Sequence, residues 1–180
     1  MSDFTNPSLM WRWYGQSRPP FADTPGPGQE SVWDYPRPPK IVEDRREIVV
    51  RLGDIEIARS CRALRICETA SPPTFYLPPE DVNRMLLVAA RSSSRCEWKG
   101  MASYWTVVAG DRRIEQVAWS YEHPNDNARE IKGHFAFYPD RLECLIEGER
   151  VIPQPGRFYG GWITRELTGP FKGEPGTEGW

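Results

Sequence analysis

One thiol, one lysine and several aromatic rings occupy a short stretch in the middle of the chain. Cys96 and Lys99 lie three residues apart, and Tyr104 and Trp105 follow them. A nearby cation favours the thiolate, which is the nucleophilic form of cysteine. The pair therefore predicts a nucleophilic cysteine, or a lysine that binds a phosphate or carboxylate. The alternative is a buried structural thiol beside a surface lysine.

A second group of aromatic residues follows along the chain. Trp119, Tyr121 and His123 alternate, so in a strand they share one face. Tyr104 and Trp105 fall on opposite faces of the preceding strand, and one of them can pair with Trp119. Such a face is typical of a platform on which a flat ligand, such as a nucleobase, stacks. Ordinary core packing is the alternative interpretation.

Charged residues and one histidine add further candidates. Arg65 and Glu68 could bind and orient an anionic group, or could form an ion pair at the rim of a sheet. His134 could act as a general base near neutral pH, or could be a hydrogen-bonded histidine of the sheet. The predicted ligand-binding residues are Arg65, Glu68, Tyr76, Lys99, Tyr104, Trp119 and Tyr121. The catalytic candidates are Cys96 and His134.

Composition excludes several classes of partner. The 180 residues carry a formal net charge of -2, so no basic surface favours binding to nucleic acid. The chain shows neither a secretory signal nor an apolar run of the roughly 20 residues that a membrane span needs. We therefore expect a cytoplasmic protein without a membrane or nucleic-acid partner. The four cysteines form no C-x-x-C pair, which predicts free thiols, no metal site and no cofactor.

The two ends of the chain differ from its middle. Eight of the 18 prolines lie in residues 1–40, and eight of the 15 glycines lie between Gly148 and the end. Both tails are nevertheless rich in aromatic residues, which gain by burial. We predict an N-terminal extension over 1–40, a β domain over 41–147 and a C-terminal extension over 148–180 that docks on the core. A homodimer formed through the tails is a further expectation.

The middle of the chain has the pattern of short strands. Gly53-Asp54 and Gly110-Asp111 predict tight turns between strands. Residues 134–138 and 142–146 are predicted to pair with each other, and Pro79–Leu87 is predicted to be the one helix. The remaining predicted strands cover residues 47–52, 55–58, 62–67, 74–77, 101–109 and 114–121. This pattern predicts a mainly β, small antiparallel domain with one short helix and extended N- and C-terminal segments.

Several of these segments together resemble one known family. They include Ala58-Arg59-Ser60, Lys99-Gly100, Tyr104-Trp105 and Ala118-Trp119-Ser120-Tyr121. They resemble the uncharacterised family catalogued as domain of unknown function 427, which also carries a nucleotidyltransferase-like label. The resemblance implies a β-tent-like or barrel-like fold.

The chain departs from this family and its fold in two ways. The family commonly has proline after the cysteine, whereas this chain has Glu97, and a carboxylate beside Cys96 favours the protonated thiol. Proteins of the β-tent fold often bind zinc on two C-x-x-C knuckles, which this chain lacks. The resemblance therefore implies no metal here.

Three functional hypotheses follow. The first is a protein that binds a small planar or anionic ligand in an aromatic-lined pocket. The second is an enzyme, either nucleotidyltransferase-like as the family label implies or dependent on Cys96 or His134. The third is a structural or interaction protein that dimerises through its tails.

Overall fold

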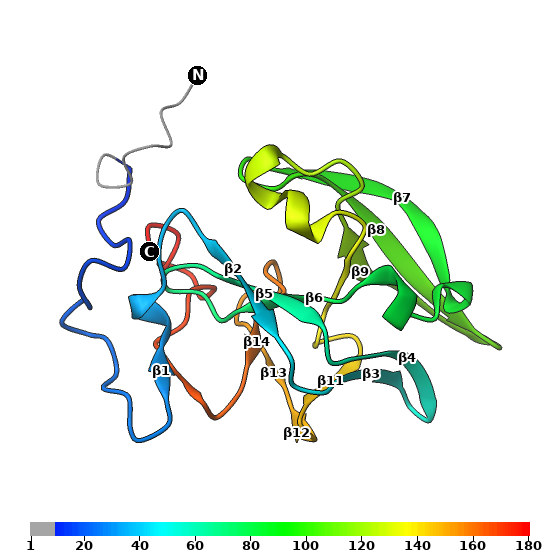
Figure 1. The fold of residues 1–180 in the computed structure, drawn as a ribbon, viewed down its shortest axis with the longest axis horizontal. Helices are drawn as coiled ribbons and strands as arrows, with labels where there is room; N and C mark the ends of the chain where they lie inside the picture. Colours follow the sequence, from blue (N-terminus) through cyan, green and yellow to red (C-terminus); the bar gives the residue numbers. More distant parts are fainter. Residues whose placement is uncertain (1–9) are drawn as a thin grey trace. The chain divides into compact units, whose positions relative to one another are not determined.

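Strands dominate the computed structural model, which describes residues 10–180 (Figure 1). It is 44% strand and 9% helical, so the predicted mainly β fold is confirmed. The chain divides into two compact units. The first contains the described residues up to Val42 together with Ile66–Thr74 and Ile152–Trp180, and the second contains Glu43–Arg65 and Phe75–Val151.

The second unit contains two four-stranded sheets. One has the order β12-β11-β3-β4, with β12 at Glu149–Arg150, β11 at Glu143–Ile146, β3 at Ile48–Leu52 and β4 at Ile55–Ser60. Its β3–β4 hairpin turns at Gly53 and Asp54, as predicted, with Leu52 opposite Ile55. Gly53 has a φ of 58°, a conformation that glycine adopts without steric cost.

The other sheet of this unit contains the longest strands (Figure 1). Its order is β10-β9-β8-β7, with β10 at Phe135–Phe137, β9 at Arg112–Ser120, β8 at Gly100–Ala109 and β7 at Leu87–Cys96. All of its strand pairs are antiparallel. The 3-10 segment η5, Asp126–Ile131, follows β9 and buries Ala128 and Ile131.

A three-stranded sheet has the order β2-β5-β6. These strands are β2 at Lys40–Asp44, β5 at Ala63–Cys67 and β6 at Thr74–Tyr76. Three of the four boundaries between the two units fall within these strands, and the fourth falls between Val151 and Ile152. The sheets of residues 10–180 form no closed barrel.

The predicted helix over Pro79–Leu87 is wrong. Two separate 3-10 turns stand in its place: η3, Pro79–Asp81, and η4, Arg84–Leu86. Val82 between them forms a β-bridge with Ala58, and the next backbone N–H, that of Asn83, donates to the carbonyl oxygen of Ile57 at 2.8 Å. The backbone N–H of Asn83 is therefore used by β4 and not by a continuous helix, and Met85 is left 94% exposed.

The predicted pairing of residues 134–138 with 142–146 is also wrong. Strand β10 pairs with β9, whereas β11 pairs with β3 and β12. Both segments contain a strand, but β10 pairs with the preceding strand β9, and β11 pairs with β12, which follows it closely, and with the distant β3. Strands β2 and β7 were not predicted.

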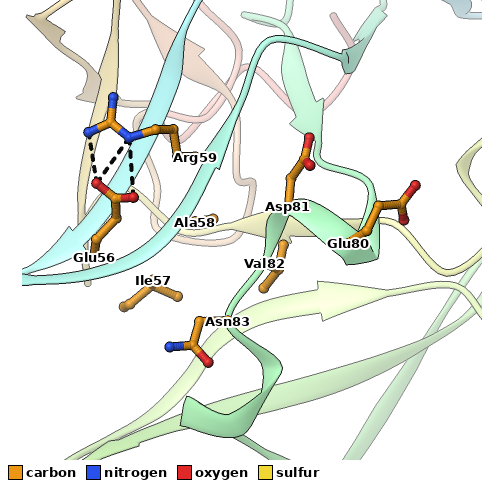
Figure 2. Close-up of a pocket in the computed structure, with 8 residues that line it drawn as sticks. All are labelled: Glu56, Ile57, Ala58, Arg59, Glu80, Asp81, Val82 and Asn83. Carbon is orange, nitrogen blue, oxygen red and sulfur yellow. Dashed lines mark hydrogen bonds and ion pairs between the residues drawn. The ribbon is translucent and has the colours of Figure 1, made fainter.

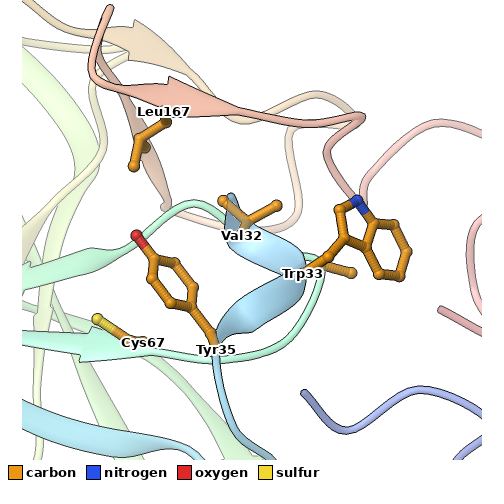
Figure 3. Close-up of a cluster of buried hydrophobic side chains, with 6 residues drawn as sticks. Val32, Trp33, Tyr35, Cys67 and Leu167 are labelled. Atoms are coloured by element: carbon orange, nitrogen blue, oxygen red, sulfur yellow. The ribbon is translucent and has the colours of Figure 1, made fainter. Parts of the chain in front are cut away.

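The first unit brings residues of both tails together around a small core. Strand β1, Glu30–Ser31, pairs in parallel with β15, Leu167–Thr168, and β13, Ile152–Pro153, pairs with β14, Trp162–Ile163. The 3-10 segment η2, Val32–Asp34, contributes side chains to this core (Figure 3). The buried cluster consists of Val32, Trp33, Tyr35, Cys67, Ala70 and Leu167.

Candidate functional site

The register of the β10-β9-β8-β7 sheet gathers aromatic side chains on one of its faces. Tyr104 on β8 lies directly opposite Trp119 on β9, and Ala136 on β10 lies opposite Trp119 from the other side. Because side chains alternate along a strand, Tyr121 and Tyr138 fall on this same face. Tyr76, from β6, packs against this face through Trp119 and Tyr121. We call the group of Tyr76, Tyr104, Trp119, Tyr121 and Tyr138 the aromatic face. Of the two residues that could pair with Trp119, Tyr104 does so, and Trp105 lies opposite Ala118.

Tyr76 and Trp119 form the buried centre of the aromatic face. The indole Nε1 of Trp119 donates to the hydroxyl oxygen of Tyr76 at 3.1 Å, and the two rings lie edge to face. The ring centroid of Trp119 is 4.4 Å from that of Tyr138, and that of Tyr76 is 6.4 Å from that of Tyr121. All four side chains are buried.

Burial also fixes the protonation of these phenols. It raises the pKa of Tyr76, and the hydrogen bond from Trp119 opposes this shift only in part. Burial likewise raises the pKa of Tyr121 and of Tyr138. The three hydroxyl groups are therefore neutral at physiological pH and keep a proton that they can donate.

Lys99 lies over the edge of the aromatic face. Its Nζ atom is 6.0 Å from the ring centroid of Tyr76 and 5.8 Å from that of Tyr121. These distances allow a cation–π attraction. The side chain is half-buried, and within residues 10–180 no carboxylate forms an ion pair with it. Lys99 is thus a partly desolvated cation without a counter-charge from the described chain.

A tight turn between β7 and β8 positions Lys99. Cys96 pairs with Gly100 across this turn, which leaves three residues between them. The segment after β9 holds the turn in place. The side-chain amide of Asn125 donates to the carbonyl oxygens of Glu97 and Trp98, and the backbone N–H of Asn125 donates to the carbonyl oxygen of Lys99. Gly100 has a φ of 106°, and a Cβ there would lie 3.3 Å from the His123 carbonyl oxygen. Only glycine fits this turn without strain.

Cys96 lies beside Lys99 at the rim of the aromatic face. Its Sγ atom accepts a hydrogen bond from the backbone N–H of Lys99 at 3.5 Å, and the residue is half-buried. Tyr104 completes the rim, with its hydroxyl 2.7 Å from Ser94 Oγ. Cys96, Lys99 and Tyr104 are the half-buried members of this site.

Two further residues at this site were not predicted from the sequence. Tyr138 lies against Trp119, and the guanidinium of Arg141 is 4.6 Å from the Tyr138 ring centroid. Arg141 also donates to the carbonyl oxygen of Gln116, and its Nε lies 3.9 Å from Asp140 Oδ1. The alternation of 134, 136 and 138 was visible in the sequence. Only the pairing of β10 with β9 brings Tyr138 onto the aromatic face.

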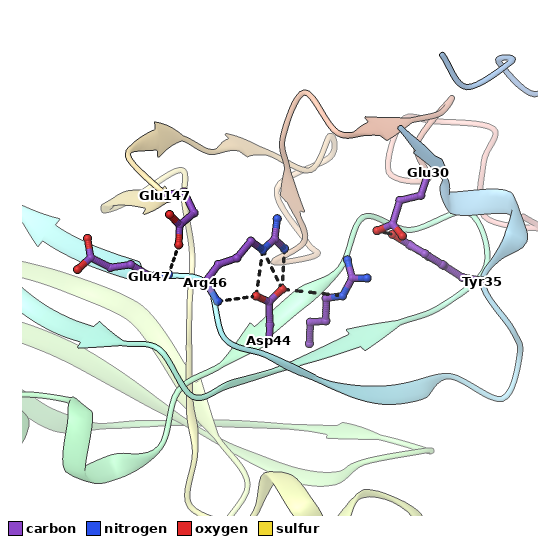
Figure 4. A network of polar contacts seen from close by, with 7 residues as sticks. Glu30, Tyr35, Asp44, Arg46, Glu47 and Glu147 are labelled. Carbon is purple, nitrogen blue, oxygen red and sulfur yellow. Dashed lines mark hydrogen bonds and ion pairs between the residues drawn. The ribbon is translucent and has the colours of Figure 1, made fainter. Parts of the chain in front are cut away.

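Arg65 and Glu68 have carboxylate and arginine partners of their own. The Nε of Arg65 lies 4.0 Å from the buried carboxylate of Asp44, which Arg46 also contacts (Figure 4). Glu68 belongs to the first unit, where its Oε1 accepts from Nε of Arg37 at 3.2 Å. The structure therefore groups five of the seven predicted ligand-binding residues, and gives Arg65 and Glu68 other partners.

His134 lies at a different place in the second unit from Cys96. Its Nδ1 is 3.1 Å from the carbonyl oxygen of Lys132. It lines a cavity of about 350 Å³ together with Asp44, Cys61 and Arg62. The two catalytic candidates thus belong to different groups of side chains.

Another hollow of about 420 Å³ lies between β4 and the η3 turn (Figure 2). Its charged side chains are already paired. Arg59 donates to Glu56, and Asp81 accepts from Ser60 Oγ at 2.7 Å and from Arg62 at 2.6 Å. The hydrogen bond from Arg62 lowers the pKa of Asp81. These residues form an anchor between η3 and β4, and the aromatic face remains the stronger candidate site.

Residues 10–180 contain neither a metal-ligand cluster nor a membrane-spanning helix. No group of three or more His, Cys, Asp or Glu residues is placed to hold a metal ion in this range. Within the same residues, no helix has the length and apolar character that crossing a bilayer requires.

A known protein family matches most of the second unit and the whole of β2. The model of a family described as a domain of unknown function, DUF427, matches residues 40–148. This range includes every residue of the aromatic face and the turn that holds Lys99. A search of the curated proteins found none that matches the chain.

Proposed function

The chain belongs to the DUF427 family, whose function its description leaves open, and we propose that it binds a small planar, anionic molecule at the aromatic face. One observation carries this proposal: the ammonium group of Lys99 lies over two buried tyrosine rings without a carboxylate partner among residues 10–180. A partly buried cation is costly unless a counter-charge or hydrogen bonds compensate it. An anionic ligand would supply that counter-charge.

The surrounding groups favour a flat ligand. Tyr104 presents a half-buried ring at the rim, and its hydroxyl can form a hydrogen bond with a ligand oxygen or ring nitrogen. Aromatic side chains bind flat rings by stacking, and a few well-placed polar groups then fix the orientation. This combination suits an aromatic carboxylate or a nucleoside monophosphate.

Replacing Lys99 by glutamine tests the proposal. We expect adenosine monophosphate, uridine monophosphate or benzoate to raise the melting temperature of the wild-type protein. At 100 times the dissociation constant, the stabilisation is about 2.7 kcal/mol. Because a hydrogen bond to a charged group contributes about 1.5–3 kcal/mol, Lys99→Gln should weaken binding by about 10- to 100-fold. The affinity is measured by calorimetric titration.

Lys132→Gln is the matched control, since Lys132 is an exposed lysine of the same unit. It should bind as the wild type does. Both variants should keep the melting temperature of the free protein. Equal affinity of wild type and Lys99→Gln, or no binding of any of the three compounds, would overturn the proposal.

A cysteine-dependent enzyme is the second candidate, because Cys96 is half-buried and accepts the N–H of Lys99. Cys67 and Cys144 are buried, whereas Cys61 is exposed. In a Cys61→Ser background, we expect iodoacetamide to modify Cys96 before the two buried thiols, at a rate that rises with pH as the thiolate forms. Mass spectrometry of the digested protein reads the site and the rate. Slow modification that does not change with pH would remove this candidate.

A further inference from the structure

The opposite face of the same sheet carries a concave site. Ser103 and Trp105 on β8 alternate with Tyr104, and Phe135 lies opposite Ser120, so these side chains point away from the aromatic face. They line a cavity of about 700 Å³ together with residues of β7. This volume lies within the range of about 300–1,000 Å³ that is typical of small-molecule sites.

An irregularity in β7 forms one wall of this cavity. Ala89 pairs with Trp105 and Ser93 pairs with Ser103, so residues 90–92 of β7 stand opposite the single residue Tyr104. A bulge of this kind bends the strand and redirects its side chains, and bulges are common beside functional sites. Here it places Ala90, Arg91 and Ser92 along the cavity.

Aromatic rings form the apolar part of the cavity. The ring centroids of Trp105 and Phe135 are 5.4 Å apart, and Leu87 and Ala89 lie beside them. The indole Nε1 of Trp105 donates to Ser120 Oγ at 2.9 Å, which fixes the orientation of the ring. A fixed, half-buried indole offers a flat surface to the carbon–hydrogen face of a ligand.

Hydroxyl and carboxylate groups are held around these rings. Ser120 Oγ donates in turn to Glu122 Oε1 at 3.1 Å, and Glu122 lines the cavity. Ser92 Oγ accepts from the Gln116 side chain at 2.8 Å and keeps its own proton for donation. Ser93 and Ser103 add further hydroxyl groups. Several acceptors and donors therefore converge where hydroxyl groups of a ligand would lie.

Two arginines supply positive charge to the same cavity. Arg84, from the η4 turn, and Arg91, from the bulge, both line it and are exposed. Neither guanidinium forms an ion pair with a carboxylate among residues 10–180. A planar guanidinium binds phosphate oxygens through two parallel hydrogen bonds.

We infer that this cavity binds a phosphorylated polyhydroxyl compound of the sugar phosphate class. Arg84 and Arg91 hold the phosphate, Glu122 and the serines bind the hydroxyl groups, and the carbon face of the sugar lies on Trp105. This site is independent of the proposed ligand of Lys99, because the two sites lie on opposite faces of the sheet.

Calorimetric titration of the whole chain with glucose 6-phosphate, glucose and inorganic phosphate tests the inference. We expect glucose 6-phosphate to bind with a dissociation constant below about 1 mM. Each of the other two probes lacks half of the recognised groups and should bind at least about tenfold more weakly. Absence of glucose 6-phosphate binding at about 10 mM would overturn the inference.

Matched variants locate the bound probe. The double variant Arg84→Gln/Arg91→Gln should weaken glucose 6-phosphate binding at least about tenfold, whereas Arg95→Gln, on the same strand but outside the cavity lining, should not. Ala89→Leu should also weaken it, because a leucine opposite Trp105 covers the indole. Equal losses in the double variant and in Arg95→Gln would show a general charge effect and overturn the assignment.

Lys99→Gln separates this inference from the proposed function. It should leave glucose 6-phosphate binding unchanged. If Lys99→Gln abolishes binding and the arginine double variant does not, the probe occupies the aromatic face. That result would overturn the inference and support the proposed function instead.

Discussion

Replacing Trp33 by alanine is expected to lower the free energy of unfolding by about 3–5 kcal/mol, the usual loss for a fully buried tryptophan. The side chain has no exposed surface, and its Nε1 donates to the carbonyl oxygen of Pro170 at 3.1 Å. Its ring lies 5.3 Å from that of Phe21 and 5.3 Å from that of Trp180. Truncation would leave a cavity where the N-terminal and C-terminal segments meet.

Urea denaturation followed by circular dichroism measures this loss. Trp33→Phe keeps a ring and should cost less than Trp33→Ala. Phe158→Ala is the control, since Phe158 is 77% exposed, and it should change the unfolding midpoint little. We also expect proteases to cut Trp33→Ala faster in both segments of the first unit. An unchanged midpoint and unchanged proteolysis would show that the cluster around Trp33 does not hold the tails.

Local patterns in the sequence were sufficient to predict most strands of the second unit. The β-branched run Ile48-Val49-Val50 and the turn at Gly53-Asp54 define β3 and β4 without reference to distant residues. Strand β7 was missed because its second half, Arg91–Arg95, is polar on both faces and contains the bulge. A bulge removes the period of two by which a strand is recognised.

Long-range pairing accounts for the wrong predictions. The Pro79–Leu87 segment has the residue types of a helix start, but the hydrogen bond from Asn83 to Ile57 and the bridge of Val82 to Ala58 hold it as separate turns. Tertiary contacts of this kind override weak local propensity. No local feature of 134–138 indicates that its partner is β9 instead of the strand that follows it.

Only the part of the candidate site that depends on local spacing could be predicted from the sequence. The alternation of Trp119 and Tyr121, and a cross-strand pairing of Trp119 with either Tyr104 or Trp105, followed from residue spacing within one hairpin, and the structure pairs Trp119 with Tyr104. Tyr138 depends on the β9–β10 pairing, which spacing does not reveal. Arg65 was predicted to belong to the site, but in the folded chain it lies beside the carboxylate of Asp44.

The second prediction with a large expected effect concerns the buried carboxylate of Asp44. Asp44 is 7% exposed, and Arg46 contacts it through its backbone N–H and its guanidinium, with Nη2 2.6 Å from Oδ2 (Figure 4). Burial alone would raise the pKa of Asp44. The hydrogen bonds from Arg46 and the charges of Arg46 and Arg65 outweigh burial, so its pKa is lowered. The folded protein therefore holds this carboxylate ionised more strongly than the unfolded chain does.

Because the pKa of Asp44 is lowered in the folded state, the stability that this carboxylate contributes decreases in acid. Above the unfolded pKa of about 3.9, Asp44 is ionised in both states and its stabilisation is fully present. As the pH falls below that value, the unfolded chain binds the proton first. The stabilisation is then lost progressively until the pH passes the lowered pKa of the folded protein.

Asp44→Asn should therefore destabilise the protein at neutral pH and much less in acid. We expect a loss of about 2–3 kcal/mol near pH 7, since the variant leaves two arginines without their shared carboxylate. The difference from the wild type should shrink toward about pH 3, because below about pH 3.9 the unfolded wild-type chain binds the proton first and the stabilisation by the ionised carboxylate is progressively lost. Urea denaturation at about pH 3, 5 and 7 gives both unfolding energies.

Glu43→Gln is the matched control for Asp44→Asn. Glu43 is the preceding residue and also contacts an arginine, Arg45, at 3.5 Å, but both side chains are largely exposed. Solvent screens such a pair, so its loss should change the unfolding energy little at any pH. If Asp44→Asn destabilises equally at pH 3 and pH 7, its effect comes from lost packing or hydrogen-bond geometry. A buried charge network around Asp44 predicts that the destabilisation fades with acid, and that Glu43→Gln shows no such trend.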